Sequence, residues 1–488
     1  MPYVVGEDRK QSILFPEALD DYISEDNLVR VIDAYIEQLD IVDLGFRFAE
    51  PPGMGRPPYN PRDMLKLYLY GYLNGVRSSR RLEHETIRNI EVLWLLNKLS
   101  PDFKTIADFR KNNKKSLKKI FREFNRLCNE WDLFGKERVA IDGSKFKACN
   151  SKKNSFTKKK ITRQLKYLDE KIDTYMKELD QNDQREEVDR KPDLDEINKR
   201  IHELRERKNK YEEHKKELEE SGQSEISTTD PDARLMPTNH NSIEVSYNIQ
   251  TSVDAKHKLV ADFKVTNSPN DMGQLDTMAL RSKKLFKSDQ LEVLADKGYY
   301  QVEDLKKCVK EGITPYVSKQ TYSNGTGDKD FYSDKFTYDR EKDAYTCPAG
   351  NELRFTKKRK TKAKGVLGYD YTNYKACSGC NYRTRCTSSK KGRSIFRHVD
   401  QDFLDTIDQQ TKENMKTYRL RQIIVEHPFG TVKRNWGAYY FLTKGLKSVS
   451  AEMSLSFWAY NFKRMVNILG AGEVIRRLRE RKGELAQA

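Results

Sequence analysis

Two short apolar runs that each end on an aspartate predict a pair of buried strands. The run 139–141 precedes Asp142, and the run 291–295 precedes Asp296. A short run of Val, Ile, Leu and Ala bounded by polar residues is typical of a strand buried on both faces. If the two strands are neighbours, both carboxylates lie at the edge where the sheet opens to solvent. They would then repel each other unless a hard divalent cation lies between them.

The patterns around these runs predict a mixed sheet. Residues 243–253 and 258–266 alternate in polarity as two strands joined by a tight turn, and a helix follows. After the run 291–295, a helix is expected over 302–310 and a strand over 314–318. Counted from Val139, the order strand, strand, strand, helix, strand, helix, strand predicts an α/β fold with helices on both faces of the sheet.

Two acids in this region are explained by local structure. Asp254 falls in the turn at 254–257, and Asn270 and Asp271 precede the helix that follows the second strand. Asp and Asn are preferred turn and helix-capping residues because their side chains bond nearby backbone amides. We therefore interpret Asp254 as a turn residue and Asp271 as a cap, and not as metal ligands.

The first 135 residues have mostly helical periodicity. One helix begins at Asn60 and Pro61, and the basic segment 75–81 separates it from a further helical pattern. A helix, a short turn and a second helix with Arg at the junction fit a helix-turn-helix DNA reader. An ordinary helical bundle with a solvated basic face fits these residues equally well.

A highly charged segment interrupts the expected sheet. Residues 158–221 contain 18 basic and 19 acidic residues, and apolar residues recur at spacings of three and four on both sides of a polar break at 181–192. This pattern predicts an antiparallel helical hairpin that forms a coiled coil with itself or with a second subunit. Its expected role is structural or in assembly.

The excess of positive charge points to a polyanionic partner. The 488 residues carry a formal net charge of +17, with a pI of about 9.2. Between residues 345 and 400 there are 14 Lys or Arg against 3 Asp or Glu, interleaved with aromatic residues. Basic and aromatic residues gathered in this way favour binding to a nucleic-acid backbone over general solubility.

Four of the seven cysteines gather in the same basic segment. Cys377 and Cys380 form a close pair, Cys386 follows them, and Cys347 comes thirty residues earlier. These are the ligand types of a structural zinc site, and clustered cysteines in a reducing cytosol favour metal over disulfides. Reduced, unligated cysteines are the alternative, because the gap between Cys380 and Cys386 is wider than in a standard knuckle.

The chain has no apolar stretch of the roughly 20 residues that span a bilayer, and its amino terminus lacks the features of a signal peptide. We therefore expect a cytoplasmic protein without a membrane partner.

The acids and their surroundings resemble a known family. Asp142 in VAIDGSKFKACN, Asp296 in LADKGYY and Glu426 in VEHPFGTVKR are similar to the three acids of bacterial insertion-sequence transposases of the DDE type, whose catalytic core is ribonuclease H-like. The segments GRPPYNPRDMLKLYLYGYLNG, TDPDARLM and YNIQTSVD extend the likeness over nearly the whole chain. The resemblance implies a ribonuclease H-like mixed sheet and a nucleoid-associated bacterial enzyme that acts as a homodimer on double-stranded DNA, both element ends and target.

The resemblance also implies roles for individual residues. Asp142, Asp296 and Glu426 would hold two Mg²⁺ or Mn²⁺ ions for phosphodiester hydrolysis and strand transfer, and Lys433 would lie near a phosphate. Related enzymes carry an Arg four residues before the last acid, where this chain has Gln422. Arg419 and Arg421 are the candidates to bind phosphate in its place.

These patterns divide the chain into five parts. We expect a helical DNA-binding domain, a catalytic core in three segments, a charged helical hairpin, a basic four-cysteine insertion, and a carboxyl-terminal helix with a basic tail. In that order they cover residues 1–135; 136–157, 222–320 and 405–447; 158–221; 321–404; and 448–488.

Two other functions remain open from the sequence. A DNA-binding regulator derived from a transposase would keep the helical and four-cysteine parts without turnover, and a cut-only nuclease would cleave without joining. The presence of all three acids favours the transposase.

Overall fold

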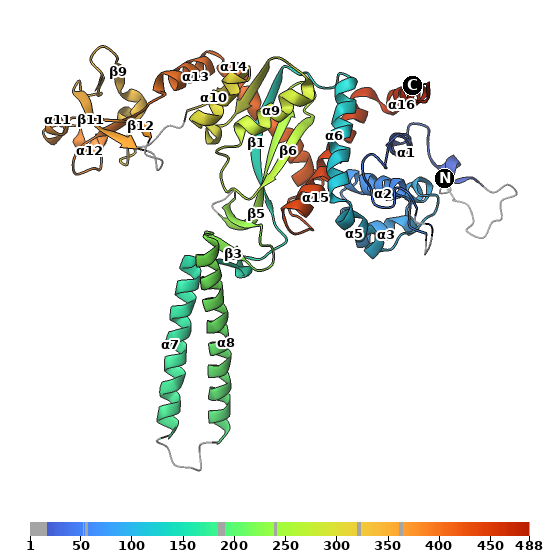
Figure 1. Cartoon of the computed structure of the whole chain (residues 1–488), viewed down its shortest axis with the longest axis horizontal. Helices are drawn as coiled ribbons and strands as arrows, with labels where there is room; N and C mark the ends of the chain where they lie inside the picture. Colours follow the sequence, from blue (N-terminus) through green and yellow to red (C-terminus); the bar gives the residue numbers. More distant parts are fainter. Residues whose placement is uncertain are drawn as a thin grey trace, which may run out of the picture.

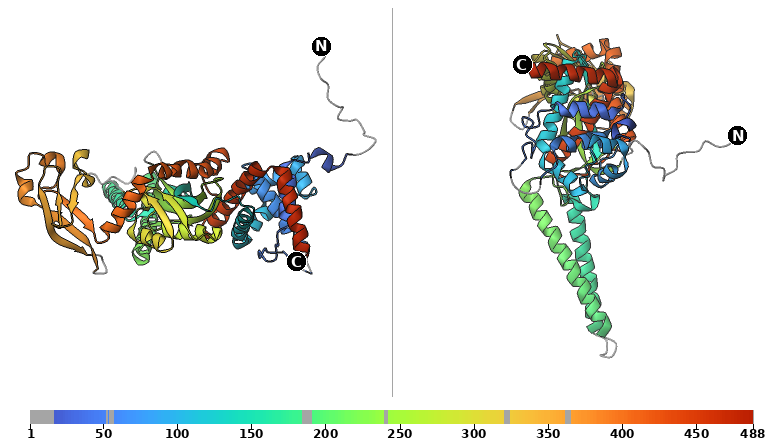
Figure 2. Two further views of the ribbon diagram at one scale, coloured as in Figure 1. Left: turned by 90° about the horizontal axis from the view of Figure 1, so that it is seen from above. Right: turned by 90° about the vertical axis from the view of Figure 1, so that its right-hand side faces the viewer.

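The computed structural model describes residues 17–51, 53, 57–183, 191–238, 242–319, 324–360 and 365–487. The expected features of the amino terminus and most of the polar break at 181–192 lie outside these residues. Three compact parts lie in a row, and a long helical hairpin projects from the middle one (Figures 1 and 2). No helix in the described part of the chain combines the length and apolar character that a membrane span needs.

The middle part is built on one mixed sheet. Strand β1 lies at its centre, with β7 and β8 parallel to it on one side and β5 antiparallel on the other. The far edge of β5 pairs with β4 and then with β6, so the strand order is β6, β5, β1, β7, β8 with β4 beside the start of β5. The strands are Arg138–Lys147 (β1), Arg234–Pro237 (β4), Ile243–Asp254 (β5), Val260–Thr266 (β6), Leu291–Ala295 (β7) and Ile313–Val317 (β8).

Helices cover both faces of this sheet. On one face, Ser282 of α9 (Leu275–Phe286) bonds Ser252, which is paired with Ile141 of β1. On the other, Phe429 of α14 (Met415–Phe429) packs against Phe146 of β1. Side chains at 141 and 146 point to opposite faces because a strand alternates with a period of two. The predicted mixed α/β fold is confirmed and is consistent with a ribonuclease H-like core.

One detail of the predicted strands is wrong. Strand β1 does not end at Asp142 but runs on to Lys147. Only its pairing with β7 stops, at Ile141 opposite Ala295, while its pairing with β5 continues. The polar residues after Asp142 therefore continue β1 beyond the point where its pairing with β7 ends. A search for apolar runs does not detect such a polar extension of a strand.

A helical part lies at one end of the row and combines both ends of the chain (Figure 1). Tyr35 of α1 contacts Trp458 and Phe462 of α15, and Gln38 donates a hydrogen bond to the Leu478 carbonyl of α16. The segment expected to be a basic tail is thus a helix. The helices are α1 (Leu28–Glu37), α2 (Pro61–Leu73), α3 (Ser79–Arg88), α4 (Ile90–Leu95), α5 (Phe103–Asn112), α6 (Lys114–Glu130), α15 (Leu446–Leu469) and α16 (Ala471–Gln487).

The arginine between α2 and α3 is structural. Arg77 is 7% exposed, lies 3.4 Å from Glu452 of α15, and donates hydrogen bonds to the carbonyls of Tyr440 and Gly437. Helix α2 is itself almost entirely buried. Arg77 therefore joins the helical part to the segment that follows Glu426. It does not face solvent.

The charged segment forms the projecting hairpin. Helices α7 (Lys158–Asp183) and α8 (Lys191–Ser221) run side by side, and the small strands β2 (Ser155–Thr157) and β3 (Glu225–Ser227) pair at their base. Lys208 of α8 forms an ion pair with Asp169 of α7 at 2.8 Å. The predicted antiparallel hairpin is confirmed, with its apolar stripe buried between the two arms.

The cysteine-containing part lies at the other end of the row. A five-stranded sheet has the order β13, β12, β11, β10, β9, and helix α13 (Gln401–Glu413) leads from it back to the core. Its elements are β9 (Thr337–Asp339), β10 (Ala344–Thr346), β11 (Glu352–Lys360), β12 (Val366–Thr372), α11 (Tyr374–Ser378), α12 (Arg383–Cys386) and β13 (Ser394–His398).

Candidate active site

Asp142 and Asp296 come together as the sequence predicts. Ile141 of β1 is paired with Ala295 of β7, so the two aspartates are the next residues on two parallel neighbouring strands. Burial, and then the negative charge of Asp296, raises the pKa of the Asp142 carboxyl to about 6. Among the described residues, the carboxylate accepts a hydrogen bond from the amide of Gly143 alone. A pair of carboxylates with so few donors is the environment that a divalent cation stabilises.

Asp296 also has a local structural role. Its side chain accepts a hydrogen bond from the Gly298 amide at 2.7 Å and so caps the short 3-10 turn Lys297–Tyr299. Only one of its oxygens is used in this way. The capping contact fixes the carboxylate beside Asp142 and leaves its second oxygen for another ligand.

Glu426 lies on helix α14, which contacts β1, β5 and β7. Its side chain is exposed, and its Oε1 accepts a hydrogen bond from Gln422 at 2.9 Å. The expected three acids are therefore not in mutual contact. Among the described residues, no group of three or more His, Cys, Asp or Glu side chains stands ready to hold a metal ion.

Helix α14 continues through Pro428. The α-helix ends at Phe429, and residues Gly430–Asn435 widen into a π-helical turn. This change of helix type places Lys433 over β1. A π-helical turn inside a helical segment often marks a functional site.

Of the two candidate arginines, Arg421 is the one near the aspartates. Its positive charge lowers the pKa of Asp142 against the effects of burial and Asp296, and its guanidinium lies 5.8 Å from the ring of Tyr418. Arg419 is exposed on a different side of α14. The face shared by Arg419, Gln422 and Glu426 therefore does not carry the arginine that acts on Asp142.

Lys433 is held close to the same strand. Its ammonium donates hydrogen bonds to Ser144 Oγ and to the Lys145 carbonyl, each at 2.6 Å, and lies 4.3 Å from the centre of the Phe146 ring. Burial lowers the pKa of Lys433 to about 8, with a further decrease from Lys145. Lys433 is therefore not a freely exposed surface residue. Two of its three ammonium N–H groups donate to β1, which leaves one N–H group for a phosphate.

Replacing Lys433 tests whether this position matters to the reaction. Lys433→Met keeps the aliphatic stem and removes a charge beside Asp142. Under the transposase activity that the sequence resemblance implies, we expect strand cleavage to fall by about 100-fold. The matched control is Arg434→Met, because Arg434 is adjacent and exposed. Both variants are assayed for cleavage of a DNA duplex that carries an element end, and their melting temperatures show whether they fold. Equal rates for the two variants would contradict a role for Lys433.

A third aspartate reaches this region, and the sequence analysis assigned it a different role. Helix α9 begins at Leu275 with Gln274 as its N-cap, so the predicted capping by Asn270 and Asp271 is wrong. Asp271 Oδ1 instead accepts hydrogen bonds from Asn248 (2.8 Å) and Gln250 (2.6 Å) of β5. Its charge raises the pKa of Asp142.

A signal for Asp271 was present in the strand order. Strand β6 is antiparallel to β5, which is antiparallel to β1, so β6 runs in the same direction as β1 and β7. The residues after β6 therefore emerge at the edge where Asp142 and Asp296 lie. Only the pairing of the strands reveals this, since the local sequence reads as an ordinary turn before a helix. Asp254, by contrast, does accept hydrogen bonds from the amides of Gly135 and Lys256, as a turn residue does.

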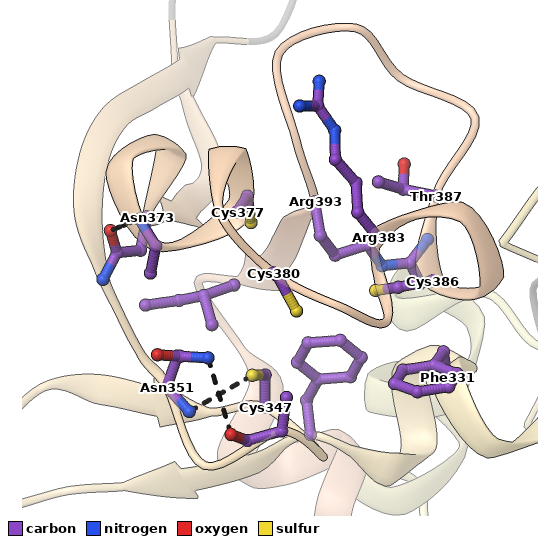
Figure 3. Close-up of a pocket in the computed structure, with 14 residues that line it drawn as sticks. Phe331, Cys347, Asn351, Asn373, Cys377, Cys380, Arg383, Cys386, Thr387 and Arg393 are labelled. Carbon is purple, nitrogen blue, oxygen red and sulfur yellow. Dashed lines mark hydrogen bonds between the residues drawn. The ribbon is translucent and has the colours of Figure 1, made fainter.

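The four clustered cysteines line one small cavity in the β9–β13 part (Figure 3). The cavity has a volume of about 30 Å³, and its cysteines come from the end of β10 (Cys347), from α11 (Cys377), from the turn after it (Cys380) and from α12 (Cys386). Burial raises the pKa of Cys386, and the other three cysteines raise it further. Cys347 Sγ accepts a hydrogen bond from the Asn351 amide at 3.3 Å.

Two residues beside the cavity are compatible with a cluster of negatively charged cysteine thiolates. Arg393 has a buried Nε with no hydrogen-bond partner in the described chain, and burial lowers its pKa while Cys386 raises it. A Cβ at Gly392, whose φ is +115°, would lie 2.7 Å from Cys377 Cβ. The loop that carries Arg393 therefore approaches the cysteines as closely as the backbone allows.

Comparisons with known proteins match both ends of the chain. A family model described as "Transposase domain (DUF772)" matches residues 17–112, and one described as "Transposase DDE domain" matches residues 346–466. The second includes Glu426, Lys433 and the four cysteines, whereas Asp142 and Asp296 lie outside both matches. No curated protein and no solved structure matches the chain.

The matched regions agree with the fold. One corresponds to the helical part that α15 completes, and the other joins the cysteine-containing part to the helix that bears the last acid. Between them lies the mixed sheet that places two aspartates at adjacent strand positions. The chain therefore carries a region similar to a transposase domain at 17–112 and a region similar to a transposase DDE domain at 346–466.

Proposed function

We propose that this protein is a transposase that cleaves DNA at the ends of its element and joins them to a target, with Asp142 and Asp296 at the centre of the reaction. The observation that supports this most strongly is the placement of the two aspartates directly after a paired Ile141 and Ala295. The raised pKa of Asp142 fits a site that is completed by a cation.

The residues present suit Mg²⁺ or Mn²⁺. Asp142, Asp296 and Glu426 would hold the ions, which requires the exposed Glu426 side chain to turn toward β1. Two such ions, when bound, stabilise negative charge on the attacking and the leaving oxygen. Asp142 carries almost no competing hydrogen bonds, so its oxygens are available.

The reaction has two steps at phosphorus. In the first, water attacks a phosphodiester at the element end, the bond to the 3′ oxygen breaks, and a 3′ hydroxyl is released. In the second, that hydroxyl attacks a target phosphodiester, forms a new P–O bond and frees a target 3′ hydroxyl. Lys433 and Arg421, both beside Asp142, would hold the reacting phosphate in line.

The cysteine-containing part provides a surface for DNA. Most of β11 is exposed, including the basic residues at 357–360 and Phe355, which is 44% exposed. Asp370 pairs with Lys357 and Arg359, whereas Lys358 and Lys360 form no ion pair with a described residue. Basic side chains next to an exposed aromatic ring are suited to the phosphates and bases of an unpaired or distorted strand.

The long hairpin of α7 and α8 is suited to assembly. It projects away from the three compact parts (Figure 1), and its charges of both signs nearly cancel. A homodimer in which each hairpin contacts the other protomer would hold the two element ends together. This would agree with a role in assembly and with no role in the chemistry.

We further propose that Cys347, Cys377, Cys380 and Cys386 bind a structural zinc ion. The four thiols line one cavity, and a cluster of zinc and four thiolates has a net negative charge that would offset the buried Arg393. The sulfurs would have to move closer together than they stand, because no described group of three ligands is within reach of one ion.

The zinc proposal gives a direct prediction. The purified transposase is expected to contain about one zinc per chain, and Cys380→Ser is expected to lose it, because a site with three thiolates binds zinc far less tightly. Cys149→Ser is the matched control, since Cys149 is also half-buried but lies outside the cavity. Metal analysis after gel filtration measures both. Absence of zinc in the wild-type protein expressed with zinc would contradict the proposal.

One assay separates the transposase from the two alternatives. The full-length protein is incubated with duplex DNA that carries the element ends, a target plasmid, and Mg²⁺ or Mn²⁺. Joined products support the proposed function. Cuts without joining support a nuclease, and a mobility shift without cuts supports a regulator; either result would contradict it.

A further inference from the structure

Asp271 lies in the space above a glycine of β1. A Cβ built on Gly143 would be 2.3 Å from Asp271 Oδ1 and 2.3 Å from Gln250 Nε2. Real Cβ atoms do not approach other atoms so closely. Gly143, directly after Asp142, is thus the residue that allows Asp271 to lie against the strand.

The same carboxylate faces the second aspartate. A Cβ on Gly298 would be 2.9 Å from Asp296 Oδ1 and 3.8 Å from Asp271 Oδ2. The two carboxylates therefore flank one glycine, from the turn that follows β7. Burial raises the pKa of Tyr299, and the negative charges of Asp271, Asp142 and Asp296 raise it further.

One oxygen of Asp271 is fixed and the other is open. Oδ1 accepts from Asn248 and Gln250 and lies 3.5 Å from the Lys145 ammonium. Gln250 is held in turn by the hydroxyl of the buried Tyr299, which donates to its Oε1. Oδ2 accepts no hydrogen bond within the described chain. A carboxylate with one anchored and one free oxygen is arranged as an oriented ligand usually is.

An unfilled acceptor beside Asp271 indicates that something else binds here. Asn248 is 0% exposed, and its Oδ1 has no hydrogen-bond partner among the described residues. This oxygen would lie 2.9 Å from a Cβ on Gly143, so it points into the same gap. The amide orientation is fixed, since Nδ2 donates to Ser268 O, Asn270 O and Asp271 Oδ1. A buried acceptor without a donor is costly, and a hydrated cation in the gap would supply one.

The two sides of β1 supply different groups. Arg421 and Lys433 approach from the α14 side, where Asp142 points, whereas Lys145 and Asp271 meet on the α9 side. The charge of Asp271 nevertheless raises the pKa of Asp142, so the two carboxylates interact although they arrive from opposite faces of the sheet.

We propose that Asp271 is a further carboxylate of the cation-binding site and contributes to it together with Asp142 and Asp296. This inference rests on the proposed function, because it concerns the same site. It goes beyond the expected set of three acids by adding a fourth, which lies closer to Asp142 and Asp296 than its position in the chain suggests.

The test measures binding of Mn²⁺ to the DNA-free, full-length protein by calorimetry, together with strand cleavage. Asp271→Asn is expected to weaken Mn²⁺ binding about tenfold or more and to reduce cleavage at least as much. Gly143→Ala changes no charge but displaces Asp271 and Gln250, and we expect the same direction of change. The matched control is Asp276→Asn, because Asp276 lies nearby in α9 and pairs with Lys307 instead. Its Mn²⁺ affinity is expected to equal that of the wild type.

Wild-type Mn²⁺ affinity in Asp271→Asn would overturn the proposal, whatever its cleavage rate. Asp142→Asn distinguishes this failure from that of the proposed function. If Asp142→Asn is inactive and Asp271→Asn binds Mn²⁺ normally, only the role of Asp271 is lost. If Asp142→Asn cleaves and joins DNA normally, the proposed function itself fails. Melting temperatures of all variants identify any that do not fold.

Discussion

Asp142→Asn is expected to reduce both strand cleavage and strand transfer by about 1,000-fold or more. A bound cation contributes several kcal/mol to transition-state stabilisation, and each 1.4 kcal/mol corresponds to a factor of ten in rate. Asparagine keeps the size of Asp142 but removes the charge that the pair with Asp296 presents. Because the proposed mechanism uses one site for both steps, both should be lost together. Gel assays with pre-cleaved ends separate joining from cleavage, and normal joining by this variant would contradict a shared site.

Asp276→Asn is the control for this measurement. Asp276 is also a poorly exposed aspartate on the α9 side of the core, but it bonds Thr277 and Lys307. Its substitution should leave cleavage and joining within a few-fold of the wild type. A comparable loss in this variant would mean that the effect of Asp142→Asn reflects folding of the core.

The same substitution is expected to stabilise the metal-free protein at neutral pH. The pKa of Asp142 is about 6 in the folded chain and 3.8 as its ordinary value. Between these values the folded state binds more protons than the unfolded state, so the free energy of unfolding falls as the pH rises. Above pH 6 the full penalty applies, which for a shift of this size is about 3 kcal/mol. Asp142→Asn removes it at pH 7.5, whereas near pH 3.5 the two proteins should be equally stable.

Thermal melts in the presence of a chelator, at a series of pH values, test this prediction. The stability difference between variant and wild type should grow from about pH 4 to pH 6 and then stay constant. Saturating Mg²⁺ should narrow it, because the ion stabilises only the protein that retains Asp142. Asp276→Asn should show no gain, since it loses an ion pair with Lys307. A variant that is less stable than the wild type at pH 7.5 would contradict the strained arrangement of the two acids.

The loss of activity and the gain in stability expected for Asp142→Asn together mean that the site lowers the stability of the core. The core holds two aspartates next to each other, where they repel, and a cation bound as proposed would relieve this loss of stability. Functional sites commonly carry such a cost because charges must be in place before the substrate arrives. The residues around Asp142 agree with this view: Arg421 offsets part of its charge, and Lys433 is held by β1 near the same point.

Apolar runs predicted the centre of the fold because buried parallel strands have a distinctive pattern. The runs before Asp142 and Asp296 become β1 and β7, and their register brings the acids together. The charged segment likewise forms the hairpin of α7 and α8, since its apolar stripe has helical spacing. The four cysteines line one cavity, although Cys347 follows β10 and the other three lie between β12 and β13.

Other features depended on long-range packing that spacing does not reveal. Asp271 appeared to be a helix cap, and only the direction of β6 brings it to the site. The basic junction between α2 and α3 fitted a DNA reader and a helical bundle equally well, and the structure pairs Arg77 with the buried Glu452, 375 residues later. Arg421, and not Arg419, acts on Asp142 because the buried Ile424 and Val425 set the rotation of α14 against the sheet.

Catalysis by Asp142 and Asp296 as proposed requires that cations bind between them. Anomalous X-ray scattering from crystals of the full-length transposase grown with Mn²⁺ measures this directly. We predict an anomalous peak within coordination distance of both carboxylates, with Glu426 turned toward it. Well-ordered, uncoordinated Asp142 and Asp296 at saturating Mn²⁺, with Mn²⁺ bound elsewhere, would contradict the account.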